Sequence, residues 1–330
     1  MSFADRSIAR MAAAALRFAL LLTWATCCPA LADTTLRVGH FPNITHAQAL
    51  VAHHLSRQGK RWFEERLGPG VKVEWFVYNA GPSAMEAIFA HSVDLTYVGP
   101  SPAINAYAKA GGEDIRIIAG AVEGGAALVV QAESNLSRPS DFRGRKIATP
   151  QLGNTQDVAA RAWLASGGLK ITLTGGDAAV IPTANPDQLA LFQTKRLDAV
   201  WTVEPWVSRL EIEAGGKVVL EEKDAVTTVL VSGAKLLREK RELARGFVAA
   251  HGELTEWIRH NPAEAQSMVR AELGAEMRAD INPELVARAW SRIVLSSAVS
   301  RELLERYVAN AKAAGFLRSA TDLSRLIERP

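Results

Sequence analysis

The chain has 330 residues, 22% of them charged, and its formal net charge at pH 7 is +3. A chain of this length can bury more than one compact core, and a balance so close to neutral is not typical of a nucleic-acid or polyanion binder. The two cysteines, Cys27 and Cys28, lie near the N-terminus, so the rest of the chain has no thiol for a disulfide, a nucleophile or a metal.

Residues 1–32 are typical of a secretory signal peptide. A positively charged region is followed by a short apolar stretch and by Ala30-Leu31-Ala32, a small-x-small cleavage site. The apolar stretch is too short for a membrane span, and the residues before Cys27 and Cys28 are a poor lipidation signal. We therefore predict cleavage and a periplasmic mature protein. Removal of the leader, with its three arginines and one aspartate, lowers the net charge from +3 to +1.

From residue 35 onward strand-like and helix-like segments alternate, which predicts an α/β protein with mostly parallel sheets. Strands are expected at 36–39, 73–78, 95–98, 115–119, 126–130, 146–149, 180–181, 199–203 and 226–231. Helices are expected at 47–58, 156–166 and 187–194, and from 236 to the end. In this last region the apolar stripe at 285–295 is predicted as the buried face of a helix.

The order of these segments predicts two lobes. A first lobe of residues 33–126 is interrupted by a second lobe of residues 127–226, and the chain then returns to the first lobe over 227–330. Two crossing strands would leave a ligand cleft between the lobes, lined by strand-to-helix loops from both sides. Such a clamp closes by a hinge motion.

Gly-Pro-Ser occurs twice, at 81–83 and 99–101, each time between a strand-like run and an amphipathic run. Ser83 and Ser101 are therefore expected at helix N-caps, and Gly81 beside them, where unpaired backbone N–H groups suit a small anion. Capping alone also explains both serines, and Ser83 with Glu86 fits a capping box.

Two further loops follow predicted strands. In the first, Asn43 and His46 offer donors and Phe41 an apolar wall, although Asn43 could instead cap the next helix. The second loop is Gly153-Asn154-Thr155-Gln156. Gly153 allows the backbone to approach a ligand, and Thr155 can cap a helix while lending its hydroxyl.

Glu204-Pro205-Trp206 ends another predicted strand. Trp206 could close over a ligand, whereas Glu204 could bond backbone amides, bridge the lobes or meet an amino group of a ligand. We predict no metal site among His40, His46, His53 and His54. Neither a cysteine nor a pair of acidic residues accompanies them at metal-ligand spacing, and His53 and His54 face different sides of a helix.

With these motifs the chain resembles the substrate-binding proteins of ABC importers for aliphatic sulfonates, taurine and nitrate. The resemblance runs from about residue 36 to 317. It rests on the residues at 39–43, 80–82, 99–102, 153–155, 188–198 and 204–206. It implies a type II periplasmic-binding fold, delivery of a solute to a membrane permease, and no catalysis.

The resemblance, together with the loops above, gives one set of candidate ligand-binding residues: Phe41, Asn43, His46, Gly81, Ser83, Ser101, Gly153, Asn154, Thr155, Gln156, Glu204 and Trp206. The expected ligand is a small organic oxyanion, an alkanesulfonate in preference to taurine or nitrate. We expect a monomer with no cofactor, no metal and no nucleic-acid partner. Two alternatives stay open: a dehydratase-like enzyme using His46 and Glu204, and a binder of a thiamine-precursor pyrimidine.

Overall fold

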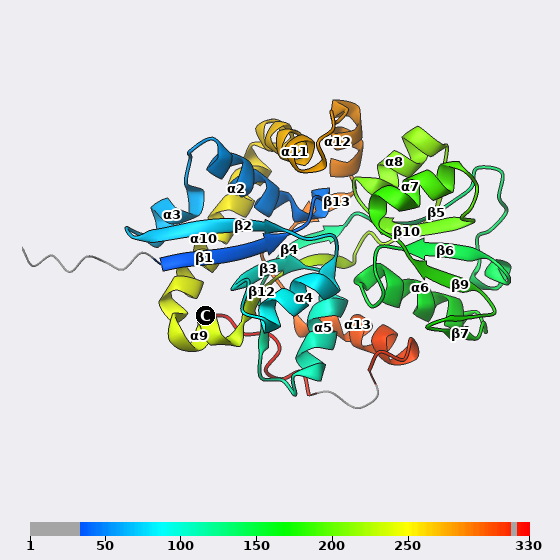
Figure 1. Ribbon diagram of the computed structural model, residues 1–330, viewed down its shortest axis with the longest axis horizontal. Coiled ribbons are helices and arrows are strands. Elements are labelled where there is room, and N and C mark those ends of the chain that lie inside the picture. Colours follow the sequence, from blue (N-terminus) through cyan, green and yellow to red (C-terminus); the bar gives the residue numbers. More distant parts are fainter. Residues whose placement is uncertain (1–33, 318–321) are drawn as a thin grey trace, which may run out of the picture. The chain divides into compact units, whose positions relative to one another are not determined.

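A computed structural model describes residues 34–317 and 322–330, and residues Thr35–Pro330 form one compact unit with two principal sheets (Figure 1). The predicted signal peptide, with Cys27 and Cys28, lies outside the described residues. Within the described ranges, no helix is both long and apolar enough to cross a membrane.

The first sheet has six strands in the order β13-β4-β12-β3-β1-β2. In chain order its strands are β1 (Thr34–His40), β2 (Val71–Val77), β3 (Leu95–Val98), β4 (Ile115–Gly124), β12 (Val226–Gly233) and β13 (Ile293–Leu295). Its helices are η1 (Ile44–His46), α2 (Ala47–Arg57), α3 (Trp62–Leu67), α4 (Gly81–Phe89), α5 (Pro100–Lys109), α9 (Ala234–Glu239), α10 (Arg241–His260), α11 (Pro262–Met277), α12 (Pro283–Trp290) and α13 (Arg301–Ala313).

The second sheet has five strands in the order β11-β5-β10-β6-β9. These are β5 (Ala126–Val130), β6 (Lys146–Thr149), β9 (Ala179–Pro182), β10 (Ala199–Val203) and β11 (Lys217–Glu221). Its helices are η2 (Pro139–Phe142), α6 (Thr155–Ser166), α7 (Asn185–Gln193) and α8 (Trp206–Ala214), and β7 (Ile171–Thr172) and β8 (Gly175–Gly176) form a small ribbon.

Both sheets are covered by helices on both faces, which explains why central strands such as β5 and β10 read as unbroken apolar runs. In β12, Leu230 packs in the core with α2, α10 and α11, while its neighbours Val229 and Val231 pack with α4, α5 and α13. In β5, Leu128 packs with α6 and the adjacent Val129 packs with α7 and α8. Successive side chains of a strand point to opposite faces, so each run fills two cores.

The sheets are mixed, and the expectation of mostly parallel sheets is wrong. β1 pairs parallel with β3, and β6 pairs parallel with β9 and β10. In contrast, β12 is antiparallel to β3 and β4, β5 is antiparallel to β10 and β11, and β13 is antiparallel to β4. A helical crossover within one sheet imposes parallel pairing, whereas β5 and β12 enter their sheets directly from the other sheet.

The chain passes from the six-stranded to the five-stranded sheet at Gly124-Gly125, between β4 and β5, and returns over 222–225, between β11 and β12. Gly124 and Gly125 have φ values of 73° and 72°, in the left-handed region that favours glycine. The division into lobes at residues 126 and 226 stays a prediction.

The stripe at 285–295 differs from its prediction as a single helix. Helix α12 ends at Trp290, and Ile293–Leu295 pair with β4 as strand β13. A three-residue strand is specified by its distant partner and leaves almost no local periodicity to detect.

Candidate functional site

A cavity of about 30 Å³ lies among loops from both sheets. Its walls come from the segments that follow β1, β2, β3 and β6, from the ends of β10 and β12, and from the first turns of α4, α5, α6 and α7. Ligand sites of α/β proteins commonly lie beyond the carboxyl ends of strands. Seven of the predicted site residues line it: Phe41, Asn43, His46, Gly81, Asn154, Thr155 and Gln156.

The cavity lining combines apolar residues with neutral polar side chains. Its described lining contains no lysine, arginine, aspartate or glutamate. The titratable side chain there is His46, and burial is the main cause that holds the pKa of its imidazole well below the ordinary value. His46 Nδ1 accepts a hydrogen bond from the Phe41 N–H at 3.4 Å, which a neutral imidazole can do. A ligand would therefore meet neutral donors and helix starts.

The two serines of the Gly-Pro-Ser motifs lie inside helices, and the N-cap and capping-box expectations for them are wrong. Helix α4 begins at Gly81 and α5 begins at Pro100, so Ser83 and Ser101 each lie in a first turn. The Ser83 hydroxyl donates to the Ala80 carbonyl at 2.8 Å. Proline is favoured in the first turn because its φ is already helical and it has no N–H to leave unpaired, which moves both helix starts upstream.

Ser101 and Thr155 join the two sides of the cavity. The Ser101 N–H donates to Thr155 Oγ1 at 3.4 Å. The Ser101 hydroxyl is buried and has no hydrogen-bond partner among the described residues. The expectation that Thr155 caps α6 is wrong. The N-cap is Asn154, whose side chain accepts a hydrogen bond from the Asp157 N–H at 2.8 Å. The Thr155 hydroxyl is thus left for contacts across the cavity.

The loop before α6 is held by a buried carboxylate, Asp157. This carboxylate accepts from Thr149 Oγ1 at 2.9 Å and from the Gly153 N–H at 2.9 Å. It also forms a salt bridge with Arg161 at 3.0 Å, with side chains 0% and 2% exposed. Gly153 has a φ of 76° and lies outside the cavity lining. The network fixes the position of Asn154 and Thr155 relative to β6.

Two more hydrogen bonds cross between the sheets. Trp206 Nε1 donates to Asn43 Oδ1 at 3.1 Å, and the Ile44 N–H donates to the Glu204 carbonyl at 3.0 Å. Asn43 caps no helix with its side chain. Trp206 is buried and does not line the cavity, so its indole serves as a cross-link in this arrangement.

The carboxylate of Glu204 is satisfied away from the cavity. It accepts from the Ser208 hydroxyl at 2.9 Å and the Ser208 N–H at 3.1 Å, and it pairs with Arg292 at 2.8 Å. Burial raises the pKa of Glu204, while Arg292 and Ser208 act in the opposite direction. Of the roles left open by the sequence, Glu204 bonds a backbone amide and, through Arg292, reaches the segment before β13. Among the described residues, no hydrogen bond joins His46 to Glu204, and only His46 of the two lines the cavity.

Five of the predicted site residues therefore lie outside the lining: Ser83, Ser101, Gly153, Glu204 and Trp206. The lining also contains Asn79, Asn185 and Thr227, which the sequence analysis missed. Asn79 follows β2 and Asn185 opens α7, so the rule that found the other loops would have found both. Thr227 lies within β12, where no local signal marks it.

The comparisons with known proteins agree with this architecture. A model of the NMT1-like family matches residues 30–273. The putative aliphatic sulfonates-binding protein of Escherichia coli K12 is 26% identical over 213 residues, covering 63% of this chain and 61% of that protein. The taurine-binding periplasmic protein of the same organism is 26% identical over 152 residues, covering 46% of this chain and 45% of that protein. The matched region thus spans about three-fifths or less of these curated relatives.

Solved structures share the fold. The alkanesulfonate-binding protein SsuA from Xanthomonas axonopodis pv. citri, bound to MOPS, has a TM-score of 0.74 at 19% identity, covering 91% of this chain and 100% of that chain. The nitrate-binding protein NrtA from Synechocystis PCC 6803 has a TM-score of 0.69 at 15% identity, covering 88% and 83%. The predicted α/β periplasmic-binding fold is confirmed.

Proposed function

This chain belongs to the NMT1-like family, and on that basis we propose that it is the solute-binding component of an ABC importer. It captures a small organic oxyanion between the two sheets and delivers it to a membrane permease. The observation that carries the proposal is the cavity, where loops from both sheets bring neutral donors together. The names of the curated relatives, which bind aliphatic sulfonates or taurine, support the same class of ligand.

The chemistry of the lining favours a monoanion. The starts of α4, α5 and α6 supply partial positive charge and backbone N–H groups, and Thr155 and Gln156 add side-chain donors. Neutral donors can satisfy a sulfonate, whose single charge is spread over three oxygens. A dianion loses more hydration on entering such a site and would need a cation to compensate. We therefore place alkanesulfonates first, with taurine and nitrate as related ligands.

The small size of the cavity fits a closed arrangement. Sites for drug-sized ligands usually enclose about 300–1,000 Å³, far more than the 30 Å³ here. The contacts from Ser101 to Thr155 and from Asn43 to Trp206 hold the two sides together. In our proposal these contacts separate to admit the ligand, and the anionic head then takes the place of the direct Ser101–Thr155 contact.

The proposal that the chain is a solute-binding component also covers its location, its oligomeric state and its lobes. The mature protein is periplasmic, residues 1–32 are its signal peptide, and it acts as a monomer without catalysis. The lobes are 33–126 with 227–330, and 127–226, and the cleft between them is the site.

A thiamine-precursor pyrimidine is the second candidate ligand. Five carboxamide side chains line the cavity: Asn43, Asn79, Asn154, Asn185 and Gln156. A carboxamide presents a donor and an acceptor side by side, which matches the edge of a neutral aminopyrimidine. This set of amides is the observation that favours the alternative over other neutral ligands.

A thermal-shift screen separates these candidates, because a ligand that binds the folded state raises the apparent stability by mass action. The panel holds alkanesulfonates, taurine, nitrate, a phosphonate dianion and an aminopyrimidine. We expect concentration-dependent stabilisation by the sulfonates and little by the dianion. Stabilisation by the pyrimidine alone would establish the alternative, and no stabilisation by any compound would contradict both.

A further inference from the structure

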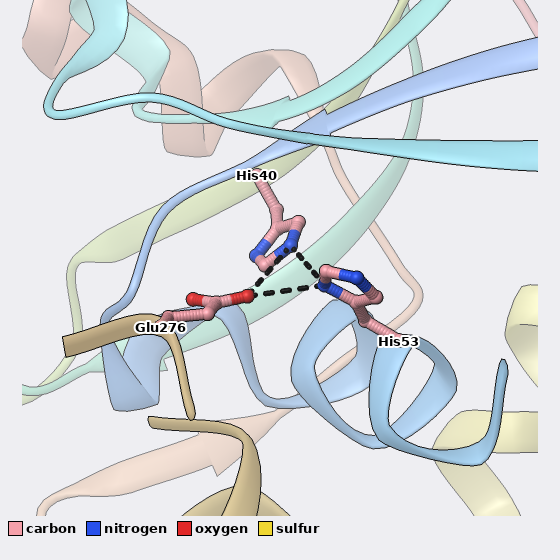
Figure 2. Close-up of side chains that lie close together, drawn as sticks. All are labelled: His40, His53 and Glu276. Atoms are coloured by element: carbon pink, nitrogen blue, oxygen red, sulfur yellow. Dashed lines mark hydrogen bonds and ion pairs between the residues drawn. The ribbon is translucent and has the colours of Figure 1, made fainter. Parts of the chain in front are cut away.

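Two histidines and a glutamate from distant parts of the chain meet beside the six-stranded sheet (Figure 2). His40 is the last residue of β1, His53 lies in α2 and Glu276 lies near the end of α11. His40 Nε2 and His53 Nδ1 are 3.1 Å apart, and Glu276 Oε1 lies 3.2 Å from the first and 3.1 Å from the second. The three side chains thus direct one atom each toward a common point.

The hydrogen-bond geometry of His40 leaves this point open to a cation. His40 Nδ1 lies 3.3 Å from the Phe41 carbonyl, to which only a protonated Nδ1 can donate. In the neutral imidazole this leaves a lone pair on Nε2, which faces Glu276 Oε1. Two acceptors at 3.2 Å repel unless a proton or a metal ion lies between them.

A second observation concerns the other oxygen of Glu276. This side chain is 2% exposed, and its Oε2 is buried without a hydrogen-bond partner among residues 34–317 and 322–330. A buried carboxylate oxygen left without a partner carries a full desolvation penalty. Coordination of a cation by the carboxylate would relieve it.

We propose that His40 Nε2, His53 Nδ1 and the Glu276 carboxylate bind a divalent transition-metal ion of the zinc class. Imidazole and carboxylate ligands suit zinc and its neighbours, and bonds of about 2.0–2.1 Å in a tetrahedral site place ligand atoms roughly 3.4 Å apart. The observed separations of 3.1–3.2 Å need only a small expansion. Glu272 Oε1, at 3.0 Å from His53 Nδ1, is the protein atom placed to supply a fourth ligand.

The surroundings have the features of a built metal site. Glu272 and Glu276 are one helical turn apart on α11, so both carboxylates face α2. Arg57 holds Glu272 at 2.8 Å, and the Phe41 carbonyl orients His40, as outer partners of metal ligands do.

Residue spacing predicted no metal site because the carboxylate is remote in the chain. Glu276 lies 223 residues from His53, so no spacing rule could connect them. The competing explanation is a metal-free cluster in which protonated imidazoles pair with the two glutamates. That cluster would have the same contacts but would bind no metal ion.

A cobalt titration tests the proposal. The protein, purified without a polyhistidine tag and treated with a chelator, is titrated with Co²⁺ while its visible d–d absorption is recorded, and Zn²⁺ is then added. We expect one equivalent of Co²⁺ to bind with the intense absorption of a low-coordinate site, and one equivalent of Zn²⁺ to displace it. Because this measurement uses the unmodified chain, it does not depend on whether any variant folds.

Two ligand variants and two matched controls locate the ion. His53→Gln and Glu276→Gln should weaken the affinity for Co²⁺ by more than the roughly 10- to 100-fold that loss of an outer partner costs. His260→Gln and Glu264→Gln change exposed residues of α10 and α11 and should bind as the unmodified chain does. Circular dichroism checks the fold of each variant.

Two outcomes would overturn the proposal. The first is failure of the unmodified protein to bind one equivalent of either metal, which is the result expected of the protonated cluster. The second is binding by folded His53→Gln and Glu276→Gln proteins at the affinity of the two controls.

Discussion

At the scale of single residues, some buried polar groups have a hydrogen-bond partner for each polar atom, and others have a polar atom without one. His251 belongs to the first kind, because its Nε2 lies 2.8 Å from the Gly120 carbonyl and its Nδ1 lies 3.0 Å from the Tyr97 hydroxyl. Ser101 belongs to the second, with a buried hydroxyl that has no partner among the described residues, in the segment between Gly99 and Pro102 of the cavity lining. Proteins tolerate such unsatisfied groups mainly where function needs them.

Ser101→Ala should separate stability from binding. It removes an unsatisfied hydroxyl, so the melting temperature of the ligand-free protein should stay the same or rise. The affinity for the oxyanion should fall by about tenfold, because one hydrogen bond to a charged group is lost. Calorimetric melting and titration of the same variant check both halves. A destabilised apo-protein with normal affinity would assign Ser101 to the structure alone.

His251 should make the protein less stable in mild acid. Burial lowers the pKa of this imidazole to about 4, from an ordinary value near 6.5, so the unfolded chain binds a proton in this window and the folded chain does not. The neutral imidazole's contribution is complete above pH 6.5 and is lost as the pH falls toward 4, by about 3 kcal/mol.

Urea unfolding from pH 4 to 7 measures this effect, with the His251→Gln protein as the comparison. The unmodified protein should show the steeper fall in unfolding free energy across this range, since the other titrating groups are common to both. Parallel pH profiles would contradict the assignment.

At the scale of elements, the cavity depends on how α6 begins. Asp157 lies in the first turn of α6 and fixes the preceding loop through Gly153, Thr149 and Arg161. The buried carboxylate is therefore a structural support for Asn154 and Thr155, which line the cavity.

Asp157→Asn should destabilise the fold strongly. It leaves the buried Arg161 guanidinium without its counter-charge, and breaking one partner of a buried ion pair costs about 3–5 kcal/mol. Denaturant unfolding measures the loss. The exposed pair of Lys195 and Glu133 supplies the control, since Glu133→Gln should change stability by less than about 1 kcal/mol. Equal effects of the two substitutions would show that the Asp157 network carries no special weight.

Among the secondary-structure elements, the buried central strands were predictable from the sequence. The strands at 95–98, 126–130, 146–149 and 199–203 have their expected bounds, because each has a buried, largely apolar centre with polar or glycine residues at or beyond its ends. Strands β11 and β13 were missed. β11 lies at an edge of its sheet and is partly exposed, and β13 is defined by its pairing with β4.

The loops of the candidate site were predictable from the sequence, but the pairings between its distant side chains were not. Residues in the loops and helix starts that come after predicted strands, such as Asn43 and Thr155, line the cavity. The role of Glu204 could not be predicted without its partner Arg292, nor the cluster around His40 without Glu276. Both partners are far away in the chain. Local patterns indicate which loops face a site, whereas pairings between distant side chains depend on the completed fold.

At the scale of the whole molecule, function in our account depends on the two sides of the cavity coming together. Gly99 shows how close they are, because a methyl group added there would collide with the Thr155 hydroxyl from the other side. Gly99 has φ −67° as the N-cap of α5, so alanine fits its backbone and the collision is the main effect.

Gly99→Ala should therefore hinder closure without unfolding either side. We expect weaker ligand binding together with a melting temperature close to that of the unmodified protein. Small-angle scattering with and without ligand reports closure directly, and the smaller radius of gyration induced by ligand should be lost in the variant. Gly252→Ala, in α10 at a position where an added methyl group meets open space, is the control for a glycine substitution by itself. Unimpaired closure of the Gly99→Ala protein would contradict this view of the cavity.

The most direct test of the account is isothermal titration of a short alkanesulfonate into the unmodified protein and into Ser101→Ala/Thr155→Val, at pH 6 and pH 8. We predict binding to the unmodified protein with nearly equal affinity at the two pH values, because the imidazole of His46 is neutral at both. The double variant should keep its fold and lose detectable binding. Equal affinity in the double variant, or binding that appears only at pH 6, would contradict an oxyanion site built from neutral donors.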